Sequence, residues 1–166
     1  MNPSTAATLG YQAKLKTPFG VLGICCSEEK LTGIAFLPPQ VKALSPQNAL
    51  AREVCGQLSA YLADAGFHFD LPLDLAGTDH QRRVWHAMCA IPCGQVRTYG
   101  DLAAEMRSSP RAVGQACGNN PIPVVVPCHR IVGKHGLVGF MHHSGGRATD
   151  IKRWLLEHEH ALPDFA

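Results

Sequence analysis

The sequence predicts an α+β protein in two parts: a small N-terminal antiparallel sheet with one helix, then a mostly helical C-terminal domain that contains a helix-turn-helix. Residues 11–37 alternate between apolar and polar side chains, interrupted by the turn signal Thr17-Pro18-Phe19-Gly20. Apolar residues then recur at helical spacing after residue 46 and again after residue 78. The 166 residues, 46% of them hydrophobic, suffice for one ordinary domain or two small ones.

We expect a domain boundary near Gly77, with a sheet domain over residues 1–77 and a second domain over residues 78–166. Ser45-Pro46 predicts the start of the first helix, because serine is a good N-cap and proline suits the first helical position. Gly66 suits the end of that helix. The sheet and the linker before Gly77 are expected to supply strands at 11–16, 21–26, 31–37 and within 67–77.

In the second domain, Thr78 is expected to cap a first helix and Thr98 a second one that runs to about Met106. After the turn at 107–110, another helix is expected from Arg111 to about Gly118. Two short helices joined in this way fit a helix-turn-helix and equally an ordinary helical hairpin. Several small residues in the second of these helices indicate close approach, either to another helix or to a DNA groove.

The last part of the chain is expected to hold a glycine-rich loop at 133–146 and a helix at 151–159. Ile151, Trp154 and Leu155 supply the apolar side of that helix, and Trp154 and Leu155 are the expected packing residues.

A cysteine and a histidine stand side by side in Pro127-Cys128-His129-Arg130, directly after the apolar stretch 122–126. This order predicts a cysteine at the end of a short buried strand. The thiolate is the reactive form of cysteine, and a free thiol with a pKa of about 8.5 is mostly protonated at neutral pH. Because a neighbouring histidine can take the proton, the pattern indicates a nucleophile. The alternative is a structural cysteine beside an incidental histidine.

Charge and cysteine usage leave the partner open but favour a reducing compartment. The net charge of +2 neither requires nor excludes a nucleic acid. The seven cysteines are odd in number and lack the spacing of a disulfide framework, which favours the cytosol. We expect no signal peptide, no membrane span and, without a repeated CxxC or an HExxH motif, no metal.

At the level of motifs, residues 11–161 resemble the O6-alkylguanine-DNA alkyltransferases. The order and spacing of five motifs carry the resemblance: Val96-x-Thr98-Tyr99-x-x-Leu102-Ala103, Arg111-Ala112-Val113-Gly114, Asn120-Pro121-x-Pro123, Pro127-Cys128-His129-Arg130 and Lys152-x-Trp154-Leu155-Leu156-x-His158-Glu159. The resemblance implies a single-turnover repair protein that flips O6-alkylguanine out of duplex DNA and moves the alkyl group irreversibly to its own cysteine, with a minor activity on O4-alkylthymine.

The resemblance also implies roles for the catalytic residues. Cys128 would attack the alkyl carbon, and His129 would take the thiol proton through a bridging water. Glu159 would orient His129 and stabilise its charged form. Tyr99 would donate to the guanine ring nitrogen, and Asn120 would fix the turn that presents Cys128.

On the DNA side, the resemblance implies that Arg111 takes the place of the flipped base and that its helix lies in the minor groove. The implied contacts to DNA come from Thr98, Arg111, Ala112, Gly114 and Gln115. The implied base pocket comprises the Ile131 carbonyl, the Ser144 amide and His143, which stands where the family usually has an aromatic residue. Double-stranded DNA with an alkylated guanine is the implied partner; no cofactor, no membrane, a monomer and a cytoplasmic or nucleoid location are expected.

Two other functions remain open on the residues alone. A binding module could recognise alkylated bases without chemistry, in which case Cys128 would be dispensable. A Cys-His hydrolase or a thiol redox protein would act without DNA, although the Arg111 helix has no role there.

Overall fold

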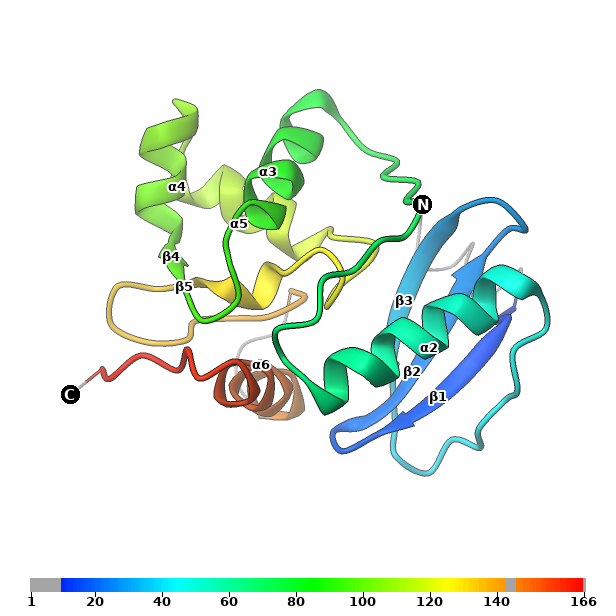
Figure 1. Ribbon diagram of the computed structural model, residues 1–166. Coiled ribbons are helices and arrows are strands. Elements are labelled where there is room, and N and C mark those ends of the chain that lie inside the picture. The colour runs from blue at the N-terminus through cyan, green and yellow to red at the C-terminus, as the bar shows by residue number, and fades with distance from the viewer. Residues whose placement is uncertain (1–9, 143–145, 166) are drawn as a thin grey trace. The chain divides into compact units, whose positions relative to one another are not determined.

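The computed structural model describes residues 10–142 and 146–165, and these residues divide into two compact units between Ala76 and Gly77. Within the described residues, the first unit holds an antiparallel sheet and one α-helix (Figure 1), and the second holds four α-helices and a two-stranded parallel pair. The predicted α+β class is confirmed.

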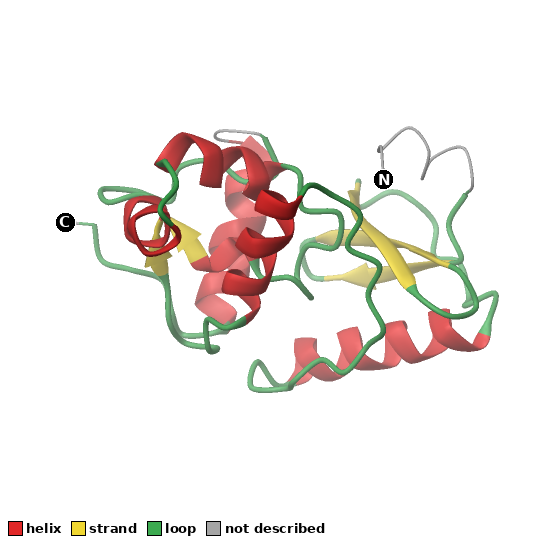
Figure 2. Ribbon diagram, turned by 90° about the horizontal axis from the view of Figure 1, so that it is seen from above, coloured by secondary structure: helices red, strands yellow, loops and turns green. Residues whose placement is uncertain are grey.

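The sheet of the first unit has the strand order β1-β2-β3 (Figure 1), and Figure 2 shows the strands of this sheet beside the long helix α2. The central strand β2 is buried along its whole length, and α2 packs on β1 and β2. The turn forms as the sequence predicts, with Gly20 at φ 130° and the Thr17 hydroxyl donating to the Gly20 carbonyl at 3.0 Å. The elements are β1 (Ala13–Thr17), β2 (Gly20–Cys26), β3 (Leu31–Leu37) and α2 (Ala49–Ala63).

Helix α2 begins later than predicted, because Asn48 and not Ser45 is its N-cap. The preceding residues are held as extended chain along β1: Lys14 and Leu44 exchange backbone hydrogen bonds, and the Gln47 amide donates to the Gln12 carbonyl at 2.8 Å. The Asn48 side chain then accepts from the Ala51 amide, a cap that serves as well as serine.

The expectations for residues 64–77 were wrong in two respects. Asp64 and not Gly66 is the C-cap of α2, and the Asp64 side chain accepts from the Gly66 amide at 2.9 Å. The expected strand is reduced to a single bridge between Leu31 and Leu73, where the segment hydrogen-bonds beside β3.

The second unit places three helices in succession, and α5 packs against both α3 and α4. Thr78 caps α3 through a capping box with Gln81, Thr98 caps α4, and Ser109 caps α5 with Pro110 at its first position. Arg107 closes α4 in the left-handed conformation, so the two helices join through a tight turn. The bounds are α3 (Asp79–Cys89), β4 (Arg97–Thr98), α4 (Tyr99–Met106) and α5 (Pro110–Gly118).

The chain after α5 departs from the predicted strand at 122–126. Val124 adopts φ 73°, and the Val126 amide donates to the Ile122 carbonyl at 2.9 Å, so the segment folds into a tight loop. A short 3-10 turn, η1 (Cys128–Arg130), follows it and leads into β5 (Ile131–Val132), which pairs in parallel with β4. An apolar run of five residues is compatible with either a strand or a buried loop.

The last helix, α6 (Gly146–His158), begins five residues before the predicted start. Its first turn lacks the apolar periodicity on which the prediction depended. Lys152 and Leu156 are buried beside Ile151 and Leu155, whereas Trp154 is only partly buried and stacks on His158 with ring centroids 4.8 Å apart. Leu155 is therefore buried as expected, whereas Trp154 is buried only in part.

Candidate active site around Cys128

Cys128 owes its position to the side chain of Asn120, which is buried at the end of α5. The Asn120 amide donates to the Val126 carbonyl at 2.8 Å, and its oxygen accepts from the Ile122 amide at 3.0 Å. These two bonds close the loop that contains Val124 and bring Cys128 to the first position of η1. Because a buried amide with both ends satisfied strongly favours one backbone path, Asn120 fixes the presentation of the cysteine.

Cys128 is 3% exposed, and its Sγ lies 3.7 Å from Met141 Sδ. Burial raises the pKa of Cys128 to about 11, although the Asn120 side chain and the charge of Lys152 oppose the shift. The resting group is therefore a thiol. An attack by sulfur requires a base that removes its proton as the reaction proceeds.

A fully buried histidine stands beside this thiol. Nε2 of His129 lies 2.8 Å from Glu159 Oε2, and both side chains are completely enclosed. Burial lowers the pKa of His129, against the opposing effect of Glu159, so the ring is neutral at neutral pH. With Nε2 donating to the carboxylate, Nδ1 keeps a free lone pair, and it has no hydrogen-bond partner within residues 10–142 and 146–165. This tautomer is the one that can accept a proton.

Glu159 also receives a second partner, Arg130, to which the sequence analysis gave no role. Arg130 Nε donates to Glu159 Oε1 at 2.8 Å and Nη2 to Oε2 at 3.2 Å, while Nη1 donates to the Ile91 carbonyl at 2.6 Å. A buried carboxylate requires such compensation. A buried glutamate needs a cation beside it, and this need is the signal by which the sequence could have pointed to Arg130, the residue after His129.

Lys152 is the second residue that the sequence reasoning missed. It is completely buried, and its ammonium donates to the carbonyls of Ile131, Leu137 and Gly139 at 2.6, 2.9 and 3.1 Å. Burial lowers the pKa of Lys152 to about 8. Its charge also lies 5.7 Å from the ring centre of Tyr99. The sequence offers one signal, a lysine at the helical spacing of the apolar residues Leu155 and Leu156.

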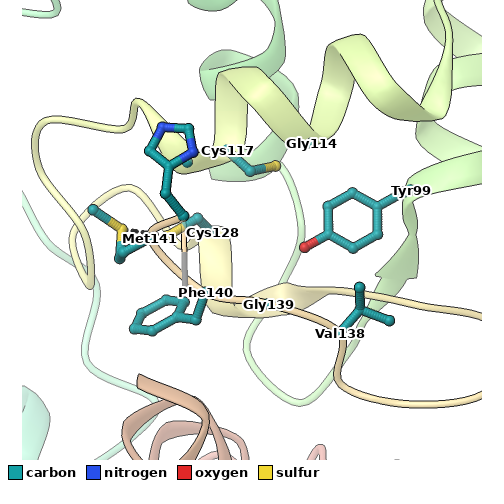
Figure 3. A pocket seen from close by; sticks show the side chains of 10 residues that line it. Tyr99, Gly114, Cys117, Cys128, Val138, Gly139, Phe140 and Met141 are labelled. Carbon is teal, nitrogen blue, oxygen red and sulfur yellow. Dashed lines mark hydrogen bonds between the residues drawn. The ribbon is translucent and has the colours of Figure 1, made fainter. Parts of the chain in front are cut away.

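A cavity of about 320 Å³ opens in front of the thiol. Figure 3 shows the Tyr99 hydroxyl directed into it from α4, with Cys128 and Met141 on the opposite side. Burial raises the pKa of Tyr99, so its phenol stays protonated and able to donate. The lining residues are Tyr99, Gly114, Cys117, Gly118, Cys128, Val138, Gly139, Phe140, Met141 and His142.

The residues with an expected DNA role gather on α5 and at the start of α4. Arg111 and Gln115 are exposed, Ala112 is half-buried, and Gly114 also lines the cavity. The Thr98 side chain caps α4, because its hydroxyl accepts a hydrogen bond from the Asp101 amide at 3.0 Å. In the base pocket, the Ile131 carbonyl faces Lys152, whereas His143 and Ser144 lie outside the described residues.

The described residues form neither a metal-binding cluster nor a membrane-spanning helix. Within the described ranges, no group of three or more histidine, cysteine or acidic side chains is arranged to hold a metal ion. In the same part of the chain, every helix is too short or too polar to span a bilayer.

The chain is similar to proteins of known activity along most of its length. It is 38% identical over 157 residues to a methylated-DNA–protein-cysteine methyltransferase of Methanosarcina mazei, which covers 90% of this chain and 96% of that relative. The crystal structure of Mycobacterium tuberculosis O6-methylguanine methyltransferase is 36% identical, with a TM-score of 0.76 and coverage of 89% of this chain and 91% of that one. A crystal structure of Mycobacterium tuberculosis OGT in complex with DNA is also 36% identical, with a TM-score of 0.72 and the same coverage.

Two family models match the chain without overlap. The model of the 6-O-methylguanine DNA methyltransferase ribonuclease-like domain matches residues 11–75, and that of the DNA binding domain matches residues 79–161. The chain belongs to the 6-O-methylguanine DNA methyltransferase family.

Proposed function

We propose that this protein repairs DNA by transferring the alkyl group from O6 of guanine to Cys128, once per molecule. The observation that carries the proposal is one arrangement: a cavity with a thiol on one side and a phenol on the other, and a buried histidine–carboxylate pair next to the thiol. The family to which the chain belongs and its similarity to a protein crystallised with DNA support the same conclusion.

The first half of the reaction concerns the sulfur. Sγ of Cys128 forms a bond to the alkyl carbon while the bond from that carbon to O6 breaks, in a single in-line displacement. The thiol proton passes through one water to Nδ1 of His129, whose Nε2 stays bonded to Glu159. Glu159 stabilises the imidazolium that forms, because its carboxylate carries the opposite charge. Arg130 holds that carboxylate in place, although its own positive charge opposes protonation of the ring.

The second half concerns the base. Guanine leaves with negative charge on its ring, and the Tyr99 phenol donates a hydrogen bond or proton to the ring nitrogen. The Ile131 carbonyl accepts from the exocyclic amine while its other lone pair holds Lys152. The net reaction moves one proton from the thiol to the guanine ring, so the products are a thioether on Cys128 and unmodified guanine.

Helix α5 is the element that we assign to the DNA. Its outer face carries Arg111 and Gln115, and the small residues between them let a backbone approach a narrow groove. Arg111 fills the gap that the flipped base leaves, which offsets part of the unstacking cost of a few kcal/mol. One monomer acting at one lesion suffices for this chemistry, and a cytoplasmic or nucleoid location fits it.

The proposal is tested by incubating the protein with a duplex that contains one O6-methylguanine and measuring the intact mass and the modified peptide. We expect one methyl group per molecule, on Cys128. Cys128→Ser should abolish the transfer, whereas Cys117→Ser, which removes the other thiol of the cavity, tests whether the site is unique. Tight binding to the lesion without any added mass would instead indicate a damage sensor.

A further inference from the structure

The side of the cavity formed by residues 138–142, here called the pocket wall, has an unusual backbone. Val138, Met141 and His142 adopt φ values of 56°, 53° and 67°, in the left-handed region that non-glycine residues rarely enter. Such conformations persist only where the surroundings hold them, and they gather at ligand-binding positions.

Helix α5 holds the end of this wall through His142. The His142 ring lies against Gly118, so closely that a methyl group on Gly118 would overlap the ring atoms. Nε2 of His142 also lies 2.9 Å from Asn119 Oδ1. The absence of a side chain at Gly118 therefore makes room for His142, and the hydrogen bond to Asn119 fixes its ring.

Met141, next to this anchor, occupies the space around the nucleophile. Its sulfur lies 3.7 Å from Cys128 Sγ, and Cys128 is almost wholly covered. An alkyl group in line for transfer must touch Sγ, so it must lie beside the Met141 side chain. The cavity of about 320 Å³ is at the lower end of the ~300–1,000 Å³ typical of small-molecule pockets.

We propose that Met141, held by the contact of His142 with Gly118 and Asn119, determines the size of the alkyl group that this protein accepts. The wall favours methyl and disfavours bulky groups such as benzyl, because a larger group needs the volume that Met141 fills. The inference rests on the proposed transfer to Cys128 and adds the residues that set its substrate range.

The test compares rate constants of transfer from two duplexes, one with O6-methylguanine and one with O6-benzylguanine, measured by intact mass. Met141→Ala should raise the benzyl-to-methyl ratio by about 10-fold or more, since even one methylene in a hydrophobic pocket changes discrimination by about 10–200-fold. Met141→Leu, which keeps most of the volume, should retain the wild-type ratio. An unchanged ratio in Met141→Ala would overturn the proposal.

A double-mutant cycle tests the anchor. Gly118→Ala and His142→Ala should each raise the ratio, and the double variant should add nothing, because both changes remove one contact. If the effects of the two single changes on the ratio add fully in the double variant, the contact between His142 and Gly118 does not hold the pocket wall. His135→Ala removes an exposed histidine of the same loop outside the cavity lining and should change neither rate.

The two proposals fail in different ways. If the wild-type protein transfers no methyl group, the proposed function is wrong and the inference falls with it. If methyl transfer occurs while the ratio is the same in every variant, the size inference alone is wrong.

Discussion

At the scale of single residues, the site depends on which protonation state each buried group prefers. Burial keeps Cys128 as a thiol and His129 as a neutral ring, so the pair is not charged before the substrate arrives. A base that stays neutral at rest accepts the proton only as sulfur attacks. The carboxylate of Glu159 then stabilises the positive charge on His129, since it already lies 2.8 Å from Nε2.

Glu159→Gln tests this assignment. A glutamine amide can donate to Nε2, which would move the ring proton to Nδ1 and leave no lone pair for the thiol proton. We expect the rate constant of methyl transfer to fall by about 10²–10⁴, the contribution of a positioned base. Quenched-flow measurement with the methylated duplex gives the rate. Glu157→Gln, an exposed change two residues earlier in the chain, should leave it unchanged.

At the scale of elements, Lys152 connects three segments. It comes from α6, and its ammonium bonds the carbonyls of β5 and of the loop at 137–139, one of which belongs to the pocket wall. A buried lysine without a carboxylate is costly, but three good acceptors satisfy all of its donors. The residue thereby fixes the Ile131 carbonyl and the start of the wall relative to Tyr99.

Lys152→Met keeps much of the length of the side chain but removes all three hydrogen bonds. Leaving buried carbonyls unsatisfied costs about 1–3 kcal/mol each, so we expect the free energy of unfolding to fall by about 3 kcal/mol or more. Urea titration measures this loss. Arg153→Met, at an exposed neighbouring position, should change stability by less than about 0.5 kcal/mol. A stable Lys152→Met variant would contradict the structural role.

Helix α5 allows a test of the DNA role separately from the chemistry. Arg111→Ala should slow transfer from duplex DNA by about 10- to 100-fold, because the variant no longer offsets the cost of unstacking a base. Transfer from the free base O6-methylguanine, which needs no flipping, should stay at the wild-type rate. Arg52→Ala makes the same charge change at an exposed position of the first unit and serves as the control. Equal losses with both substrates would contradict the stacking role.

Sequence patterns predicted the caps of α3 and α4 because Thr78 and Thr98 act on residues three positions away. They misplaced the start of α2, which depends on pairing of Leu44 with Lys14, thirty residues earlier in the chain. Long-range contacts of this kind are invisible to local patterns. For the same reason, local patterns could not predict the roles of Arg130 and Lys152, because their partners Glu159 and Ile131 lie 29 and 21 residues away in the chain.

At the scale of the whole molecule, the described site residues are confined to one of the two units. All the site residues that the structure describes belong to the second unit, and so do both tryptophans, Trp85 and Trp154. Tryptophan fluorescence therefore reports on the unfolding of the active-site unit even if the two units unfold separately. Tryptophan fluorescence can therefore measure how the protonation of His129 changes the stability of the second unit.

The stability of the second unit should fall in mild acid because of His129. Burial lowers the pKa of His129 below its ordinary 6.5, so below that pH the unfolded chain binds a proton that the folded chain refuses. The contribution of neutral His129 to the free energy of unfolding is fully present above pH 6.5. It is lost as the pH falls toward the pKa of His129 in the folded protein, and the free energy then decreases by at most about 1.4 kcal/mol per pH unit. Urea unfolding followed by tryptophan fluorescence between pH 7 and pH 5 measures it. His129→Asn removes the titrating group, so its stability, although lower, should depend less on pH; an equally steep decline in this variant would assign the acid sensitivity to other groups.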